Sequence, residues 1–285
     1  MAGGSDCWRK PAWAERRKTV NLRIGLSSFT YLWFLLMLFG PIGALIWSAY
    51  GEGASALWRE LVRPEAIFAL KLTLLITVIV VVLNTLFGIL TALLIVRHPF
   101  PGVTILNTIV DLPFAVSPVI AGFMLVLLYG PNSLIGAFTG QMGFKIIFAL
   151  PGMILATLFV TFPFMVRELV PVLQEAGTWQ EQAAHMLGAG NWTTFWHVTL
   201  PSIRGGILYG IVLTVARSLG EFGAVLVVSG NLIKQTQSAT LYVYQAAADF
   251  NSAGAYSVSI LLCTISVIIL VLMETLKKYG EGKRA

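Results

Sequence analysis

Long uncharged runs of Leu, Ile, Val and Phe, separated by short charged segments, dominate the pattern of the chain. A helix that crosses a bilayer needs about 20 predominantly apolar residues. Five charge-free stretches offer roughly this length, and a sixth apolar stretch, 207–228, is interrupted by Arg217 and Glu221. The five stretches are 31–49, 72–96, 112–129, 146–166 and 250–273. The pattern predicts an all-α, polytopic membrane protein with six transmembrane helices.

The composition agrees with this pattern. Of the 285 residues, 57% are hydrophobic and 11% are charged, and the mean hydropathy is +0.81. Soluble domains are about 45–50% apolar and about 25% charged. Too little polar surface is available to cover a water-soluble fold, so soluble, disordered and nucleic-acid-binding classes are excluded despite a net charge of +6. Membrane lipid is the expected surrounding, and no nucleic acid is expected as a partner.

Basic residues are unevenly distributed between the two ends of the predicted helices. With six spans, thirteen of the nineteen Lys and Arg residues fall on the side of the termini, five on the other side, and Arg217 within the membrane. Basic residues concentrate in cytoplasmic loops, so both termini are expected in the cytoplasm. The predicted organisation is a basic tail (1–30), a six-helix domain (31–276) with a cytoplasmic loop at about 168–203, and a C-terminal tail (277–285).

The chain offers little that is typical of an enzyme. Cys7 and Cys263 cannot form a disulfide framework, and neither lies near a Cys or His at metal-ligand spacing. No G-x-x-x-x-G-K-[ST] stretch is present to cradle nucleotide phosphates, and no nucleophile–base constellation is apparent. The sequence therefore predicts no metal site, no catalytic residue and no cofactor bound by this chain.

The loop at about 168–203 carries signals of its own short helix. Thr178 and Glu181 have the spacing of a capping box, and Gly188 or Gly190 can end a helix in a left-handed conformation. A short amphipathic helix over about 179–187 is predicted. Its polar face lacks the Lys and Arg residues of a lipid-binding helix, which favours a protein partner.

The same loop resembles the EAA loop of ABC-importer permeases. That pattern reads E-A-A, three residues, G, nine residues, I, any residue, L-P, and the spacing agrees throughout. Gln182 stands where the family usually has Glu, although Glu181 is its neighbour. The resemblance implies that the loop contacts a separate ATPase, and that Pro201 lies at the start of the fifth membrane helix. The residues implied in ATPase coupling are Glu181, Gln182, Ala183, Ala184, Gly188, Leu200 and Pro201.

Three further segments, 111–122, 164–171 and 216–225, are similar to the sulfate/thiosulfate permeases of bacteria, and most of all to their W-type subunit. The resemblance implies a type I ABC-importer permease fold in the bacterial inner membrane. It also implies a T-type permease partner, two cytoplasmic ATPase subunits that bind ATP and Mg, and an external sulfate-binding protein. Molybdate and tungstate permeases share the Arg-x-x-Gly-Glu-Phe-Gly stretch, so these anions remain alternatives. An ion-coupled secondary transporter is the alternative from another class.

Two places within the predicted spans are candidates for the translocation pathway. Arg217 and Glu221 lie four residues apart, so they can pair on one helical face. They are expected either to lock the helix to its neighbours or to attract a divalent oxyanion, and intramembrane charges generally face a bundle interior or a cavity. Ser117 precedes Pro118 inside the predicted third helix, where a kink can line a cavity or serve packing alone.

Overall fold

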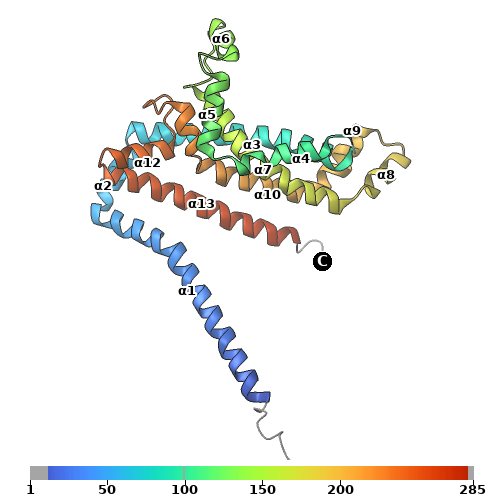
Figure 1. Ribbon diagram of the computed structural model, residues 1–285, viewed down its shortest axis with the longest axis horizontal. Coiled ribbons are helices and arrows are strands. Elements are labelled where there is room, and N and C mark those ends of the chain that lie inside the picture. The colour runs from blue at the N-terminus through green and yellow to red at the C-terminus, as the bar shows by residue number, and fades with distance from the viewer. Residues whose placement is uncertain (1–11, 99, 282–285) are drawn as a thin grey trace, which may run out of the picture. The chain divides into compact units, whose positions relative to one another are not determined.

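The computed structural model describes residues 12–98 and 100–281 (Figure 1). They divide into two compact units, with the boundary between Gly53 and Ala54. The first unit contains one 41-residue helix, α1 (Ala12–Glu52), with Pro41 inside it. Its apolar part, Leu26–Glu52, is long enough to cross a membrane and extends the stretch expected from the sequence in both directions.

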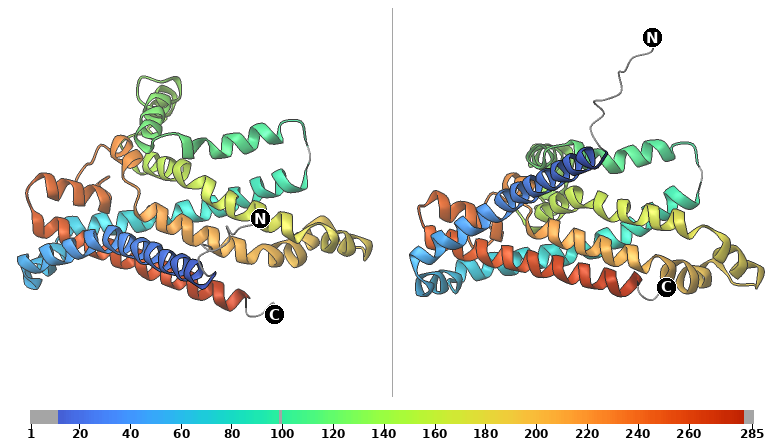
Figure 2. Two further views of the ribbon diagram at one scale, coloured as in Figure 1. Left: turned by 60° about the horizontal axis from the view of Figure 1, so that its bottom comes forward. Right: turned by 90° about the horizontal axis from the view of Figure 1, so that it is seen from below.

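The second unit is built from helices, and no strand occurs among the described residues. Four long helices run lengthwise beside one another, and the shorter helices lie either at their ends or against their sides (Figures 1 and 2). In chain order the helices are α2 (Ala54–Leu61), α3 (Pro64–Arg97), α4 (Val103–Ala115), α5 (Pro118–Tyr129), α6 (Leu134–Gln141), α7 (Leu150–Ala176), α8 (Trp179–Met186), α9 (Asn191–Thr194), the π-helix η1 (Phe195–Thr199), α10 (Leu200–Leu219), α11 (Gly223–Ser229), α12 (Ala239–Ala248) and α13 (Ser252–Glu281).

Helix α7 packs against both α3 and α10 and forms the centre of the bundle. Its Met165 is fully buried between Gly88 of α3 and Gly210 of α10, which leave room for its side chain. Small residues let membrane helices approach closely, and buried side-chain hydrogen bonds add to their association. Asn84 of α3 provides such a bond by donating to the Thr161 hydroxyl of α7 at 2.7 Å.

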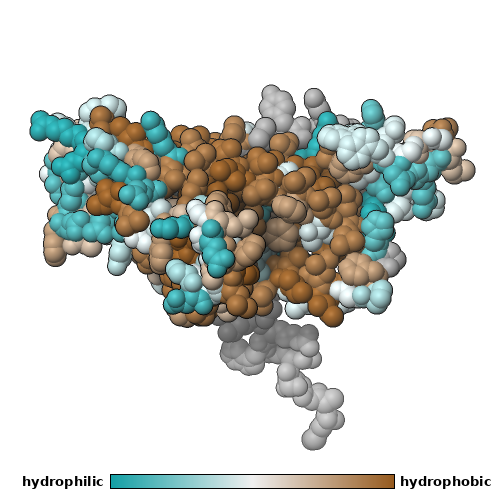
Figure 3. Space-filling view, turned by 90° about the horizontal axis from the view of Figure 1, so that it is seen from above, coloured by the Kyte–Doolittle hydropathy of each residue, from teal (hydrophilic) through white to brown (hydrophobic). Residues whose placement is uncertain are grey.

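The side chains of this unit form an apolar band between two polar ends (Figure 3). One end carries α2 and α12 and is called the α12 end, and the opposite end carries α8 and α9 and is called the α8 end (Figure 1). Many large apolar side chains in the band are exposed, as expected for lipid-facing positions. Among the described residues of both units, five helices are long and apolar enough to span, and six spans result if α4 and α5 count as one bent span. The predicted all-α, polytopic fold is confirmed.

The third predicted span differs from the expectation. A single kinked helix over 112–129 was expected, whereas α4 already begins at Val103, and α5 turns away from it by 112°. Ser117-Pro118 ends one helix and starts the next, because Pro at the first turn of a helix needs no amide donor. Asp111 lies inside α4 and forms an ion pair with Arg167 of α7.

The expectation of one helix over 207–228 was wrong. Helix α10 ends at Leu219, and α11 starts at Gly223 after a short break. Within this break the Thr240 hydroxyl donates to the Glu221 carbonyl at 2.7 Å, so this acceptor is satisfied outside a helix.

The segment in front of α10 is helical as well. Helix α10 begins at Leu200, as Pro201 predicts, but helical turns continue on its N-terminal side to Asn191. Pro201 cannot donate a backbone hydrogen bond, and the π-turn just before it lets the Leu200 amide bond to the Phe195 carbonyl. With α7 running to Ala176, the connection between the two long helices is only 177–190.

Candidate functional site

The first candidate site is the α8 loop, the connection 177–190 with helix α8. Gly188 adopts a φ of +87°, which confirms the predicted left-handed position after the helix. The Gly188 amide donates to the His185 carbonyl at 2.9 Å, and the Ala189 amide donates to the Ala184 carbonyl at 3.0 Å. Gly190, the alternative, has a φ of −73°. The loop therefore closes α8 through Gly188 alone.

The predicted capping box is absent at the described start of α8. Thr178 has helical backbone angles and makes no side-chain cap, and Glu181 does not reach back to it. The Glu181 carboxylate instead pairs with Arg97 at the end of α3, with Nε and Oε2 3.1 Å apart. It also accepts a 3.0 Å hydrogen bond from the Thr199 hydroxyl next to α10. A tertiary ion pair therefore replaces the local cap.

Arg97 binds more than Glu181. Its Nη2 donates to the Gly177 carbonyl at 2.6 Å, and its Nη1 donates to the Leu173 carbonyl at 3.2 Å. These carbonyls belong to the end of α7, where helical acceptors lack partners and favour a cation. The contacts of Arg97 with Glu181, Leu173 and Gly177 are called the Arg97 link. Both charged side chains are largely buried, with 11% of Arg97 and 18% of Glu181 exposed.

The remaining predicted residues of the loop divide between its outer surface and a hollow beneath it. Gln182 and Ala183 are exposed, and Gln182 donates to the Thr178 hydroxyl at 3.2 Å. Ala183, Ala184 and Pro201 line a hollow of about 960 Å³ bounded by α7, α8, η1 and α10. Leu200 is half-buried. Three large apolar side chains of the loop are also exposed, namely Trp179, Met186 and Leu187, and Leu187 borders the hollow.

The second candidate site is the break between α10 and α11. Arg217 Nη1 and Glu221 Oε2 lie 2.8 Å apart, so the predicted pair forms as an ion pair. The geometry at Glu221 Oε2 is not that of a hydrogen bond. The other oxygen of Glu221 accepts from the Ala224 amide at 3.0 Å and caps α11. The Glu221 side chain is 2% exposed, whereas the Arg217 side chain is 31% exposed. Glu221 is thus held from both sides of the break.

The break between α4 and α5 packs against the break between α10 and α11. A Cβ atom added to Gly122 of α5 would lie 2.7 Å from the Ala224 carbonyl oxygen of α11. Gly223 likewise lies against Pro118, with 3.2 Å between an added Cβ and the Pro118 Cβ. Ser117 is exposed and precedes α5, and its hydroxyl does not cap that helix. The helices that follow the two breaks, α5 and α11, therefore pack with their backbones in close contact.

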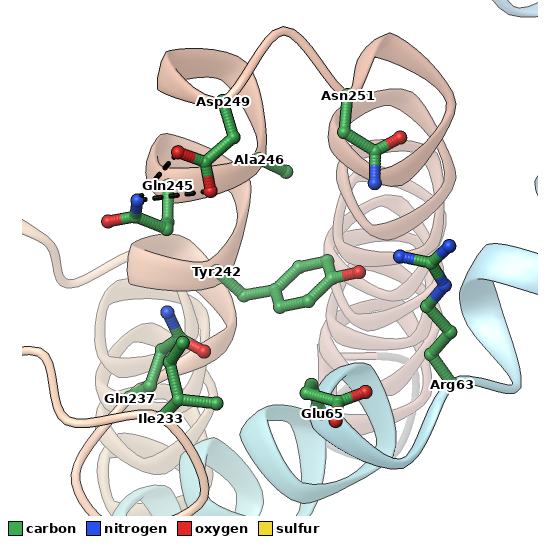
Figure 4. Close-up of a pocket in the computed structure, with 9 residues that line it drawn as sticks. All are labelled: Arg63, Glu65, Ile233, Gln237, Tyr242, Gln245, Ala246, Asp249 and Asn251. Carbon is green, nitrogen blue, oxygen red and sulfur yellow. Dashed lines mark hydrogen bonds between the residues drawn. The ribbon is translucent and has the colours of Figure 1, made fainter.

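A third feature, a pocket of about 360 Å³ at the α12 end, combines residues far apart in the sequence. Tyr242 projects from α12 toward Arg63 and Glu65, and Gln245 donates to the Asp249 carboxylate at 3.0 Å (Figure 4). Burial raises the pKa of Tyr242 above its ordinary value, and the nearby Glu60 carboxylate adds to this shift. A phenol is already a hydrogen-bond donor at neutral pH with its ordinary pKa, and this shift moves its ionisation to still higher pH.

Residues 84–278 match the family model described as "binding-protein-dependent transport system inner membrane component". The chain belongs to this family. It is 46% identical over 256 residues to the sulfate transport system permease protein CysW of Synechococcus elongatus, with 90% of each chain covered. It is 32% identical to the sulfate transport system permease protein CysT of Escherichia coli, with 94% of this chain and 97% of the relative covered. The resemblance to the W-type permeases is thereby confirmed.

A solved structure shares the fold of this permease. The bacterial alginate ABC transporter in complex with an alginate-pentasaccharide-bound periplasmic protein contains a chain with a TM-score of 0.76 and 18% identity. The similarity covers 95% of this permease and 98% of that chain. At this identity the likeness concerns the fold alone, and it confirms an ABC-importer permease fold.

Sequence reasoning missed two features of this permease. Arg97 gave only the weak signal of a basic residue in the last turn of a helix, which by itself indicates no partner. The pocket at the α12 end gave no signal, because its residues come from segments around 63–65 and 233–251. Among the described residues, no group of three or more His, Cys, Asp or Glu could hold a metal.

Proposed function

We propose that the chain is a membrane-spanning permease subunit of an ATP-driven importer that carries sulfate or thiosulfate into the cytoplasm. The observation that carries the proposal is the 46% identity to a CysW permease over nine-tenths of both chains. The fold supports it, since the chain provides several spans and a helix-bearing loop at one polar end.

The α8 loop is the proposed contact for an ATPase subunit, which binds ATP and Mg in place of this chain. The outward side chains of α8 are apolar or uncharged, as in Trp179, Gln182 and Met186. Such a surface fits a protein partner better than an anionic lipid surface. Ala183 and Ala184 allow close approach, and Gly188 ends α8 in a conformation that disfavours other residues. ATPase closure would move α8 and switch the permease between its two orientations.

This assignment fixes the proposed orientation in the inner membrane. The α8 end faces the cytoplasm together with both termini, in agreement with the distribution of basic residues. The α12 end then faces outward, where an external sulfate-binding protein would deliver the anion. The family name itself refers to binding-protein-dependent transport. A T-type permease is the proposed second membrane subunit, because the chain also matches a CysT relative over almost its full length.

The two meeting helix breaks are the proposed place where the pathway opens and closes. Non-helical backbone is tolerated within a membrane where protein or a water-filled cavity surrounds it. Ser117 is the proposed pathway residue of this region, because it is exposed beside the first break. Arg217 and Glu221 are proposed to be structural, since both Glu221 carboxylate oxygens already face a partner, Arg217 of α10 and the Ala224 amide of α11.

Co-purification and uptake measurements test the proposal. A tagged chain, expressed together with the other subunits of the proposed importer, should capture an ATPase and a second permease. Proteoliposomes that contain the complex and the external binding protein should accumulate radiolabelled sulfate only with internal ATP. Competition by thiosulfate but not by molybdate would support the proposed substrate class. Uptake by the chain alone without ATP would indicate a secondary transporter, and preferential uptake of molybdate would reassign the substrate.

A further inference from the structure

Helix α8 has few attachments of its own to the helix bundle. Within the described segment Trp179–Met186, no side chain is buried. The hollow of about 960 Å³ lies between α8 and the long helices α7 and α10, so apolar packing does not hold α8 in place. A helix attached in this way would pivot when its outer surface is pushed, unless polar contacts fix it.

The Arg97 link supplies those contacts. The guanidinium of Arg97 meets the Glu181 carboxylate of α8 and the Leu173 and Gly177 carbonyls at the end of α7. Glu181 in turn accepts from the Thr199 hydroxyl at the start of α10. One side chain from α3 thereby joins α8 to α7, and through Glu181 to α10.

We infer that Arg97 is the positioning residue that makes the bundle follow the movement of α8. This inference rests on the proposed contact between α8 and an ATPase subunit. Without the Arg97 link, closure of the ATPase would tilt α8 into the hollow and would not displace α3, α7 and α10. Glu181 accordingly acts inside this chain, whereas Gln182 and Met186 remain available to the partner.

The geometry requires Arg at this position. The planar guanidinium presents donors in several directions, whereas Lys carries one compact ammonium group. Arg97→Lys keeps the charge but cannot reach the Glu181 carboxylate and both carbonyls together. Arg97→Gln removes the charge and most donors. Glu181→Gln keeps an acceptor for Thr199 but weakens the pair with Arg97. Coupling is expected to fall from the natural chain to Arg97→Lys and further to Arg97→Gln.

The first experiment measures the position of α8 in the assembled importer. After replacement of Cys7 and Cys263 by Ser, spin labels are attached at Met186→Cys of α8 and Gln174→Cys of α7, which are both exposed. Electron-spin measurements give the distribution of distances between the two labels. This distribution should be narrow when Arg97 and Glu181 are both present, and broad for Arg97→Gln and Glu181→Gln. Arg204→Gln is the matched control, because it removes an exposed positive charge near the hollow without touching the link.

The second experiment measures coupling in proteoliposomes that contain the complete importer. Arg97→Gln should reduce sulfate uptake by about tenfold or more while ATP hydrolysis persists, the size expected from losing charge-assisted hydrogen bonds shielded from water. The ratio of ATP consumed to sulfate transported should therefore rise. Arg97→Lys should be intermediate, and Arg204→Gln should keep the natural ratio.

The two experiments separate this inference from the proposed function. If the natural complex captures no ATPase or transports no sulfate, the proposed function fails. If the natural complex transports, but Arg97→Gln and Glu181→Gln keep both the narrow distances and the natural ratio, the inference is wrong. Equal broadening in Arg204→Gln would also overturn it. Should Arg97→Gln fail to insert, Glu181→Gln tests the same link from its other side.

Discussion

Two Arg–Glu pairs of this permease have the same chemistry and different consequences. Arg97 and Glu181 are 84 residues apart and join separate helices at the α8 end. Arg217 and Glu221 are four residues apart, with Arg217 in the last turn of α10 and Glu221 in the break that follows. The first pair fixes how elements lie relative to one another, whereas the second lets the chain leave one helix and start another. Separation along the sequence, more than the residue types, decides what an ion pair does.

The surroundings of the two pairs differ as well. The Arg97 link borders a hollow of about 960 Å³, so α8 depends on polar contacts. Around Glu221 the helices meet at backbone distance, as the Gly122 contact with Ala224 illustrates. A change at the α8 end should therefore affect coupling more than stability, and a change near Glu221 should affect stability first.

The largest predicted effect is an asymmetry between the two partners of the buried pair. Arg217→Gln leaves the Glu221 carboxylate, which is 2% exposed, without its cation, and breaking such a pair costs about 3–5 kcal/mol. Glu221→Gln keeps an oxygen for the Ala224 amide, and Arg217 is exposed enough to be hydrated again. The free energy of unfolding in mixed micelles should therefore fall further for Arg217→Gln than for Glu221→Gln.

The double variant Arg217→Gln with Glu221→Gln is the internal control. It strands no charge, so it should be more stable than Arg217→Gln alone. If the pair is structural, the double variant should also retain near-normal sulfate flux in proteoliposomes. A double variant that assembles and hydrolyses ATP but transports sulfate poorly would instead assign Arg217 to the anion pathway.

An intermediate effect is predicted where the helix breaks meet. Gly122→Ala would bring a Cβ atom to 2.7 Å from the Ala224 carbonyl oxygen, and backbone cannot yield as a flexible side chain can. Overpacking of this kind costs about 1–3 kcal/mol. The thermal unfolding temperature should fall for Gly122→Ala. Gly140→Ala on α6, with no atom within 4 Å of the added Cβ, should leave it unchanged or raise it. Equal temperatures for the two variants would contradict the close packing of α5 and α11.

The membrane spans could be predicted because they depend on composition, which is a local property of the sequence. That Gly188 or Gly190 would end α8 could be predicted for a similar reason, since a helix that ends in a left-handed residue favours Gly. The partner of Glu181 could not, because a capping box and a distant arginine compete for the same carboxylate. The break after Leu219 could not be predicted either, because it also depends on a contact between residues far apart in the sequence. An apolar stretch continues through it, and the group that satisfies the Glu221 carbonyl is Thr240, nineteen residues further along the chain.

The smallest predicted effect on stability concerns the end of α8. Gly188 has a φ of +87° with no atom within 4 Å of an added Cβ, so the cost of Gly188→Val is backbone strain of about 1–2 kcal/mol or somewhat more for a branched side chain. Gly190→Val is the matched control, because Gly190 has equal space and a φ of −73°, which Val adopts freely. Both proteins should insert, and the unfolding temperature of Gly188→Val should lie only about 2–8 °C below that of Gly190→Val. Since the strain displaces α8 in only one of them, ATP-driven sulfate uptake should be lost in Gly188→Val and retained in Gly190→Val. Normal uptake by Gly188→Val at normal expression would show that the conformation after α8 does not matter for transport, and would weaken the contrast between the α8 end and the break around Glu221.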